Sequence, residues 1–223
     1  MYRILITLVA CAVSAICNAQ LKDVKPGDIL QINGVKGIVF RVNEDGTHGQ
    51  MMTVKAFRGK KDLYCSKSSY LKEVSMQDEN HGAANTSELL AYAASKGIGL
   101  SNYPVYNWCK SLGNGWYIPS VNQLKLFVNY WVGNTDVEVD WEEDGESSTD
   151  TVEETLPHTK QVNAKLLEAG GTPFLNGVFT STLNEDKKVE VFYYNKDDGK
   201  WEFKQLNPMK IDAFCVGRAF FDF

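Results

Sequence analysis

The chain has 223 residues and a formal net charge of −5, and 43% of its residues are hydrophobic and 12% aromatic. This apolar content is ample for a packed core, and the length fits one large domain or two small ones. Basic residues form no stripe, which argues against a nucleic-acid partner, and no stretch of the mature chain is long and apolar enough to cross a membrane.

Residues 1–19 have the pattern of a secretory signal peptide, with Arg3 before a short apolar stretch and small residues ahead of a cleavage point at Gln20. An N-terminal membrane anchor is the first alternative, which the short apolar stretch disfavours. Lipidation at Cys11 is the second, because LVAC resembles a lipobox, although the apolar run before it is very short. We expect an exported protein, in the periplasm or on the outer surface, whose single mature domain covers residues 20–223.

The first part of the mature chain, residues 25–57, has the pattern of strands joined by tight turns. Asn33-Gly34 is a strong hairpin signal, and residues 43–46 form a second turn. The predicted strands cover residues 28–32, 37–42 and 50–57.

Helices are expected in the middle of the chain. Asn85 or Thr86 is predicted to cap the first of them. A second, short helix covers residues 104–112. Ser120 caps a third helix, whose apolar residues recur at helical spacing until Gly133 ends it.

An acidic segment follows, within a long loop predicted at about residues 133–175. Residues 136–154 carry ten acidic residues and no basic ones, which is typical of a solvated loop. Asp140, Glu142 and Asp144 match the first half of an EF-hand loop, but Thr151 stands where a bidentate glutamate is needed. We therefore expect a solvated acidic surface, with neither a metal site nor a cofactor.

The last third returns to strands after a short helix predicted at residues 160–169. The predicted strands cover residues 177–182, 189–195 and 213–221. Strands, then helices, then strands again indicate an α+β fold with a mainly antiparallel sheet, in which the strands at the two ends of the mature chain pair.

Four aromatic residues are candidate ligand-binding residues. Trp141 lies in the acidic segment, and Tyr193, Tyr194 and Trp201 straddle the last hairpin. Exposed rings of this kind stack on sugars or anchor protein partners, but one face of that hairpin must belong to the core. The other tryptophans of the mature chain stand at helix or strand positions and are expected in the core: Trp108, Trp116 and Trp131.

The mature chain keeps three cysteines: Cys65, Cys109 and Cys215. In an oxidising compartment we expect one disulfide and one remaining thiol, and spacing alone leaves all three pairings open. Buried thiols that act as small apolar residues are the alternative.

Several short motifs resemble the bacterial C-type lectin-like domains found at the C-terminus of collagen-like surface adhesins. The matching features, in chain order, are Cys109, the GWYIPS motif of residues 115–120 with the helix after it, FTST at residues 179–182, and VGRAF at residues 216–220. The resemblance implies a twisted, mainly antiparallel sheet flanked by two or three helices with paired terminal strands. It also implies a disulfide between Cys109 and Cys215.

The calcium-ligating tripeptides of sugar-binding members (EPN, QPD, WND) are absent, and Thr180 replaces a usual tryptophan. The resemblance therefore implies a non-enzymatic module that recognises a glycan or a host surface polymer without the usual calcium ligation. The chain also lacks the hydrolase motif G-x-S-x-G, the zinc motif H-E-x-x-H and a phosphate-binding loop. The alternative function is a structural or accessory subunit of a surface assembly that acts through protein contacts, such as those with an envelope protein.

Overall fold

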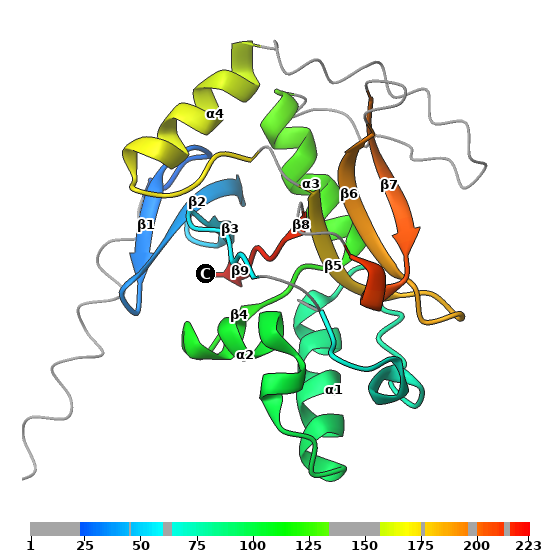
Figure 1. Cartoon of the computed structure of the whole chain (residues 1–223). Coiled ribbons are helices and arrows are strands. Elements are labelled where there is room, and N and C mark those ends of the chain that lie inside the picture. The colour runs from blue at the N-terminus through cyan, green and yellow to red at the C-terminus, as the bar shows by residue number, and fades with distance from the viewer. Residues whose placement is uncertain are drawn as a thin grey trace, which may run out of the picture.

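The computed structural model describes most of the chain after residue 22. The described residues are 23–44, 46–59, 64–133, 157–174, 177–195, 200–211 and 215–223. Within them the fold is α+β, as predicted, with two mainly antiparallel sheets and four α-helices (Figure 1). None of the helices in these ranges has the length and apolar character needed to span a membrane.

The first sheet is built from both ends of the described chain. It contains β1 (Ile29–Ile32), β2 (Val35–Val42), β3 (Gly49–Thr53), β9 (Phe220–Asp222) and β4 (Trp116–Tyr117), in that order and all antiparallel. The predicted hairpin at Asn33-Gly34 is confirmed, and both residues have the positive φ (52° and 82°) that such a turn needs. The C-terminal strand pairs with β3 and not with β1, which lies at the sheet edge.

The second sheet contains β7 (Lys200–Leu206), β6 (Val189–Asn195), β5 (Gly177–Leu183) and β8 (Cys215–Val216), in that order. The predictions for β5 and β6 are confirmed, whereas β7 was not among the predicted strands. β8 runs parallel to β5, and the other pairs are antiparallel.

The last predicted strand, residues 213–221, is divided between the two sheets. β8 belongs to the second sheet and β9 to the first, and the chain between them crosses from one to the other (Figure 1). At the crossing, Gly217 exchanges two backbone hydrogen bonds with Phe57, of 2.8 and 3.0 Å. A Cβ at Gly217 would overlap the Val105 side chain, so the close passage requires glycine.

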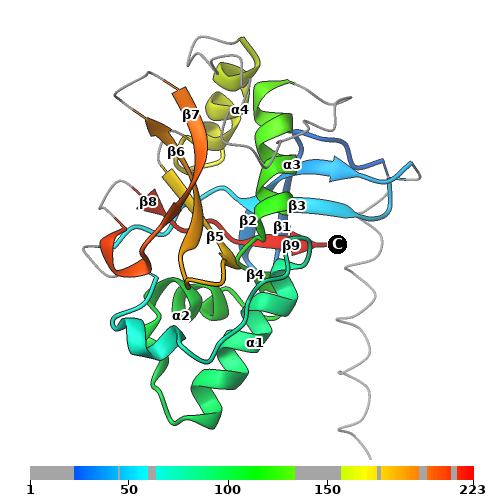
Figure 2. The same cartoon turned by 90° about the vertical axis from the view of Figure 1, so that its right-hand side faces the viewer.

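The helices fill the space between and below the sheets. α3 (Val121–Val132) lies between them and contacts β2 and β5, while α1 (Gly82–Ser95) and α2 (Pro104–Ser111) lie together at one end (Figure 2). α4 (Pro157–Glu168) lies at the opposite end, near β1 and β2 (Figure 1). Because α3 has apolar residues around most of its surface, it can bury itself against both sheets.

The predicted cap of the first helix is wrong. α1 begins at Gly82, three residues before Asn85. The Asn85 amide instead binds the backbone of Asp78, and Thr86 Oγ1 accepts a hydrogen bond from Ile118 N at 3.0 Å. Both side chains are buried, so tertiary contacts use the groups that local sequence assigns to a cap.

The predicted cap of α3 is confirmed. Ser120 and Gln123 form a capping box, and Gly133 ends the helix with φ 84°. Gln123 Oε1 also accepts a hydrogen bond from Gly82 N at 2.9 Å, so the cap joins α3 to the start of α1.

Replacing Ser120 with alanine is expected to lower the free energy of unfolding by about 1 kcal/mol, because the first turn of α3 loses its side-chain acceptor. Denaturant unfolding measures the loss. Ser87→Ala, on the exposed face of α1, is the matched control and should change stability by less than about 0.5 kcal/mol. Equal losses in the two variants would contradict the role of the cap.

Candidate functional site

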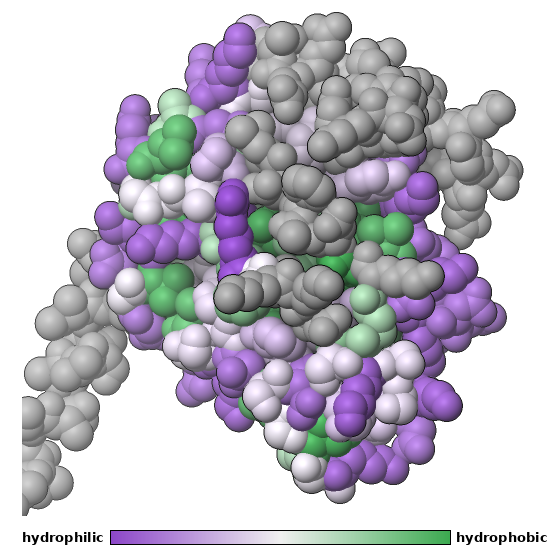
Figure 3. Space-filling model, viewed as in Figure 1, coloured by the Kyte–Doolittle hydropathy of each residue, from purple (hydrophilic) through white to green (hydrophobic). Residues whose placement is uncertain are grey.

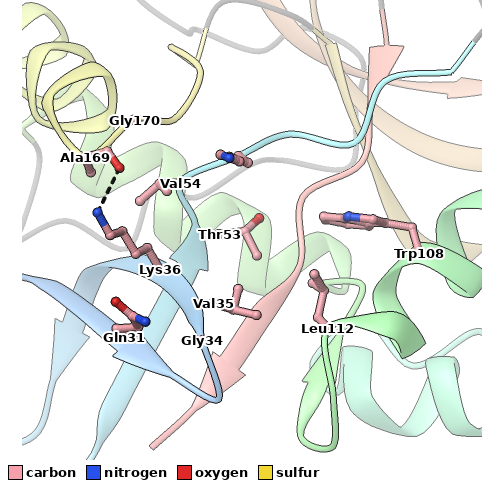
Figure 4. Close-up of a pocket in the computed structure, with 11 residues that line it drawn as sticks. Gln31, Gly34, Val35, Lys36, Thr53, Val54, Trp108, Leu112, Ala169 and Gly170 are labelled. Carbon is pink, nitrogen blue, oxygen red and sulfur yellow. Dashed lines mark hydrogen bonds between the residues drawn. The ribbon is translucent and has the colours of Figure 1, made fainter.

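The described residues form an open pocket of about 520 Å³ (Figure 4). This volume is within the range of small-molecule sites, roughly 300–1,000 Å³. Four separate segments line it. The lining residues are Gln31, Gly34, Val35, Lys36, Thr53, Val54, Lys55, Trp108, Leu112, Ala169 and Gly170.

One wall is the β1–β2 hairpin. Its register pairs Gln31 with Lys36, so these two side chains share one face of the hairpin, and Val35 lies toward Leu112 (Figure 4). Lys36 Nζ donates a hydrogen bond to the Ala169 carbonyl just beyond α4, at 3.4 Å. A cation suits this position because the carbonyls at the C-terminal end of a helix carry partial negative charge.

The opposite wall is α2 and the residue that follows it. Val105, Tyr106 and Cys109 face the core, which leaves Trp108 and Leu112 on the flank of the helix as an i, i+4 apolar pair. Trp108 projects toward the pocket in Figure 4 and is half-buried. It stacks on Phe57, with ring centroids 5.3 Å apart and planes inclined by 22°, so its ring is held in place.

The floor is the end of β3 and the backbone just after it. Thr53 and Val54 lie there, and the segment after α4 packs against them. Thr172 N donates to Val54 O at 2.9 Å. A Cβ at Gly171 would overlap the Val54 carbonyl, so glycine is needed for this approach.

A buried arginine lies behind the floor. Arg218, in the crossing segment between β8 and β9, is completely buried and donates to four carbonyl oxygens at 2.9–3.1 Å. Those acceptors belong to Thr53, Val54, Thr172 and Pro173. Burial lowers the pKa of the guanidinium, with a smaller contribution from Arg58, but an arginine starts from so high a value that it remains protonated at neutral pH.

Of the predicted aromatic site residues, the structure describes the side chains of Tyr193 and Trp201, and neither lines this pocket. Trp201 is wrong as a ligand platform, because it is only 1% exposed and stacks on Phe192 inside the core. Tyr193 is half-buried, and its hydroxyl donates to Glu202 at 2.6 Å. Tyr194 is paired with Trp201 through the β6–β7 ladder, its side chain lies outside the described part, and Trp141 is outside the described residues.

Cys109 and Cys215 are not joined in this structure, in contrast to the disulfide that the resemblance implies. Cys65, Cys109 and Cys215 are all buried thiols, as in the alternative interpretation. Cys65 Sγ donates to Lys67 O at 3.1 Å, and Cys215 Sγ occupies the space above Gly177, 2.8 Å from where a Cβ would stand. Burial raises the pKa of the Cys109 thiol to about 12, which makes it a poor nucleophile.

The weakly matched calcium residues, Asp140, Glu142 and Asp144, lie outside the described residues, as does most of the predicted acidic loop. In the described part of the chain, His, Cys, Asp and Glu side chains do not gather in groups of three or more that could hold a metal ion.

Sequence reasoning placed Trp108 in the core and so missed the site. The available signal is its pairing with Leu112, because both stand to one side of the apolar face formed by Val105, Tyr106 and Cys109.

In comparisons with protein-family models, with curated proteins and with solved structures, nothing matched this chain.

Proposed function

We propose that this protein is an exported, non-enzymatic module with a C-type lectin-like fold that binds a glycan or surface polysaccharide in the pocket beside Trp108. The half-buried, rigidly stacked indole of Trp108 in an open pocket of about 520 Å³ carries this proposal. The secretory pattern of residues 1–19 supports export.

The order of elements supports the lectin-like part of the proposal. The GWYIPS motif of residues 115–120 supplies β4 and the cap of α3, and the VGRAF motif of residues 216–220 supplies the crossing segment that leads into β9. β3, near the start of the described chain, pairs with β9 at its end. Helices α1 and α2 flank this closed arrangement (Figure 2).

The chemistry of the lining supports sugar binding. A sugar ring has an apolar C–H face, which packs on an aromatic ring, and hydroxyl groups around its edge, which need hydrogen-bond partners. Trp108, Leu112 and Val35 supply the apolar surface, and the Gln31 amide and the lysines supply polar groups. His, Cys, Asp and Glu, which carry much acid–base and nucleophilic chemistry, are not among the lining residues that the structure describes.

Surface hydrophobicity favours a small ligand over a protein partner. The exposed large hydrophobic residues of the described chain are Ile29, Leu126 and Leu167, on β1, α3 and α4. On the face shown in Figure 3, hydrophobic residues form small groups separated by hydrophilic ones. The core of a stable protein interface is usually more continuous and more apolar.

Replacing Trp108 with alanine is expected to weaken polysaccharide binding at least about tenfold, because a stacking ring is an energetic anchor of its site. Affinity electrophoresis and calorimetry on a panel of acidic and neutral polysaccharides measure the effect. Trp108→Phe should retain part of the affinity, since it keeps a stacking face.

Tyr92→Ala is the matched control, because Tyr92 is a half-buried aromatic residue on α1 that does not line the pocket. This variant should bind like the wild-type protein. Unchanged binding by a folded Trp108→Ala variant would place the ligand elsewhere, and binding of no polysaccharide by the wild-type protein would overturn the proposed function.

A further inference from the structure

We infer that the pocket selects an acidic saccharide, in which a carboxylate or sulfate group contacts Lys36 and Lys55 while the sugar ring packs on Trp108. This inference rests on the proposed function, that the pocket binds a glycan, and adds the class of glycan. The sign and placement of the charges around the pocket support an acidic ligand.

Among the described residues, the charged side chains in the lining are both cationic. Lys36 comes from β2 and Lys55 from the segment after β3, the strand that pairs with β2, so both lysines reach the pocket from adjacent parts of the chain. Lys36 is oriented by its hydrogen bond to Ala169 O. An ammonium group has three donors, so this bond leaves Lys36 two for a ligand.

Arg218 adds a third positive charge behind the floor. Two of its hydrogen bonds go to the carbonyls of Thr53 and Val54, which line the pocket. All four of its acceptors are carbonyl oxygens, so within the described chain no carboxylate neutralises this charge. A buried charge is poorly screened, and its field therefore extends into the pocket.

This placement contrasts with the chain as a whole, which has 28 acidic and 23 basic residues. A net negative protein repels a polyanion at long range. Carboxylates are nevertheless missing from the pocket lining in the described residues, whereas cations stand on its rim and beneath its floor. The pocket thus combines an aromatic surface with positive potential, which fits a sugar that carries negative charge.

Two matched pairs of polymers test the inference in the mature protein. Polygalacturonate and its methyl ester differ in carboxylate charge, and dextran sulfate and dextran differ in sulfate. We expect at least one charged polymer to bind about tenfold more tightly than its neutral counterpart. The preference should shrink as NaCl rises from about 0.1 M to about 1 M, because the screening length falls from about 10 Å to about 3 Å. Whether the preference occurs in the polygalacturonate pair or in the dextran pair distinguishes a carboxylate ligand from a sulfate ligand.

The Lys36→Gln/Lys55→Gln variant should lose the preference for the charged polymer. Lys72→Gln/Lys160→Gln is the matched control, because both of these lysines are exposed, lie outside the pocket lining and change the net charge equally. The control variant should keep the preference.

Equal binding of the charged and neutral members of both pairs, or binding of neutral polymers alone, would overturn the inference and leave the proposed function standing. If the two double variants lost the preference for the charged polymer equally, the inference would also be overturned, and the proposed function would still stand. If none of the four polymers nor any other polysaccharide of the panel binds, the proposed function fails together with the inference.

Discussion

Replacing Arg218 with alanine is expected to lower the free energy of unfolding by about 4 kcal/mol or more. Its guanidinium joins the end of β3 to the segment after α4 through the carbonyls of Thr53, Val54, Thr172 and Pro173. Each buried acceptor left without a donor costs roughly 1–3 kcal/mol, and the truncated side chain leaves a cavity.

Urea unfolding of the purified variants measures this loss. Arg218→Met separates hydrogen bonding from volume, because methionine fills much of the space and donates nothing. Arg41→Ala, an exposed arginine of β2, is the matched control and should change stability by less than about 0.5 kcal/mol. If Arg218→Met were as stable as the wild-type protein, the four hydrogen bonds would contribute no net stability, because removing the buried charge would offset their loss.

Alkaline pH is expected to destabilise the protein strongly through a buried pair of tyrosines. Tyr64 and Tyr106 are completely buried, and the Tyr106 hydroxyl donates to that of Tyr64 at 2.9 Å. Burial, the largest cause, raises the pKa of both phenols well above the ordinary value of 10.

The sign of the effect follows from proton binding. Below pH 10 the phenols are protonated in both states, but above it the unfolded chain loses protons that the folded protein retains, so stability falls as pH rises. At pH 12, two pH units above the ordinary phenol pKa, the loss approaches roughly 5 kcal/mol for the two tyrosines together. Arg218 acts in the opposite direction, because its pKa is lowered by folding.

The Tyr64→Phe/Tyr106→Phe variant isolates this contribution, because the other titrating groups cancel in the comparison. Between pH 9 and pH 12 the wild-type protein should lose about 5 kcal/mol more stability than this variant. Tyr92→Phe, at a half-buried position on α1, should follow the wild-type curve. Parallel curves for the wild-type protein and the double variant would show that the buried phenols do not set the alkaline limit.

Local signals predicted most of the secondary structure. The Asn33-Gly34 turn, the α3 cap at Ser120 and its end at Gly133 each depend on neighbouring residues, and each is confirmed. The cap of α1 was wrong because Asn85 binds the backbone of Asp78, before the helix, and Thr86 binds that of Ile118, 32 residues away. Local sequence indicates which side chains can hydrogen-bond to nearby backbone groups, but it does not indicate which partners the tertiary structure supplies.

The candidate site was harder to predict, because it depends on which face of an element is buried. Trp108 and Trp201 both have aromatic side chains in regular elements, yet the first lines a pocket and the second fills the core. In β7 the alternation of side chains allows either face to be buried. β7 packs on α3, where Trp131 contacts Trp201 with ring centroids 5.5 Å apart. This packing determines which face of β7 is buried.

The sequence by itself determined the α+β class, the first hairpin, the α3 cap and the excess of acidic residues, since composition and near neighbours are enough for these. Only the tertiary structure decided the crossing of the C-terminal segment between the sheets, the burial of Arg218 and the pocket beside Trp108. Lys36 meets Ala169 across 133 positions, and Arg218 meets Thr53 across 165. Contacts at such separations become favourable only when the whole core forms, because ordering the intervening chain costs entropy that no local interaction offsets.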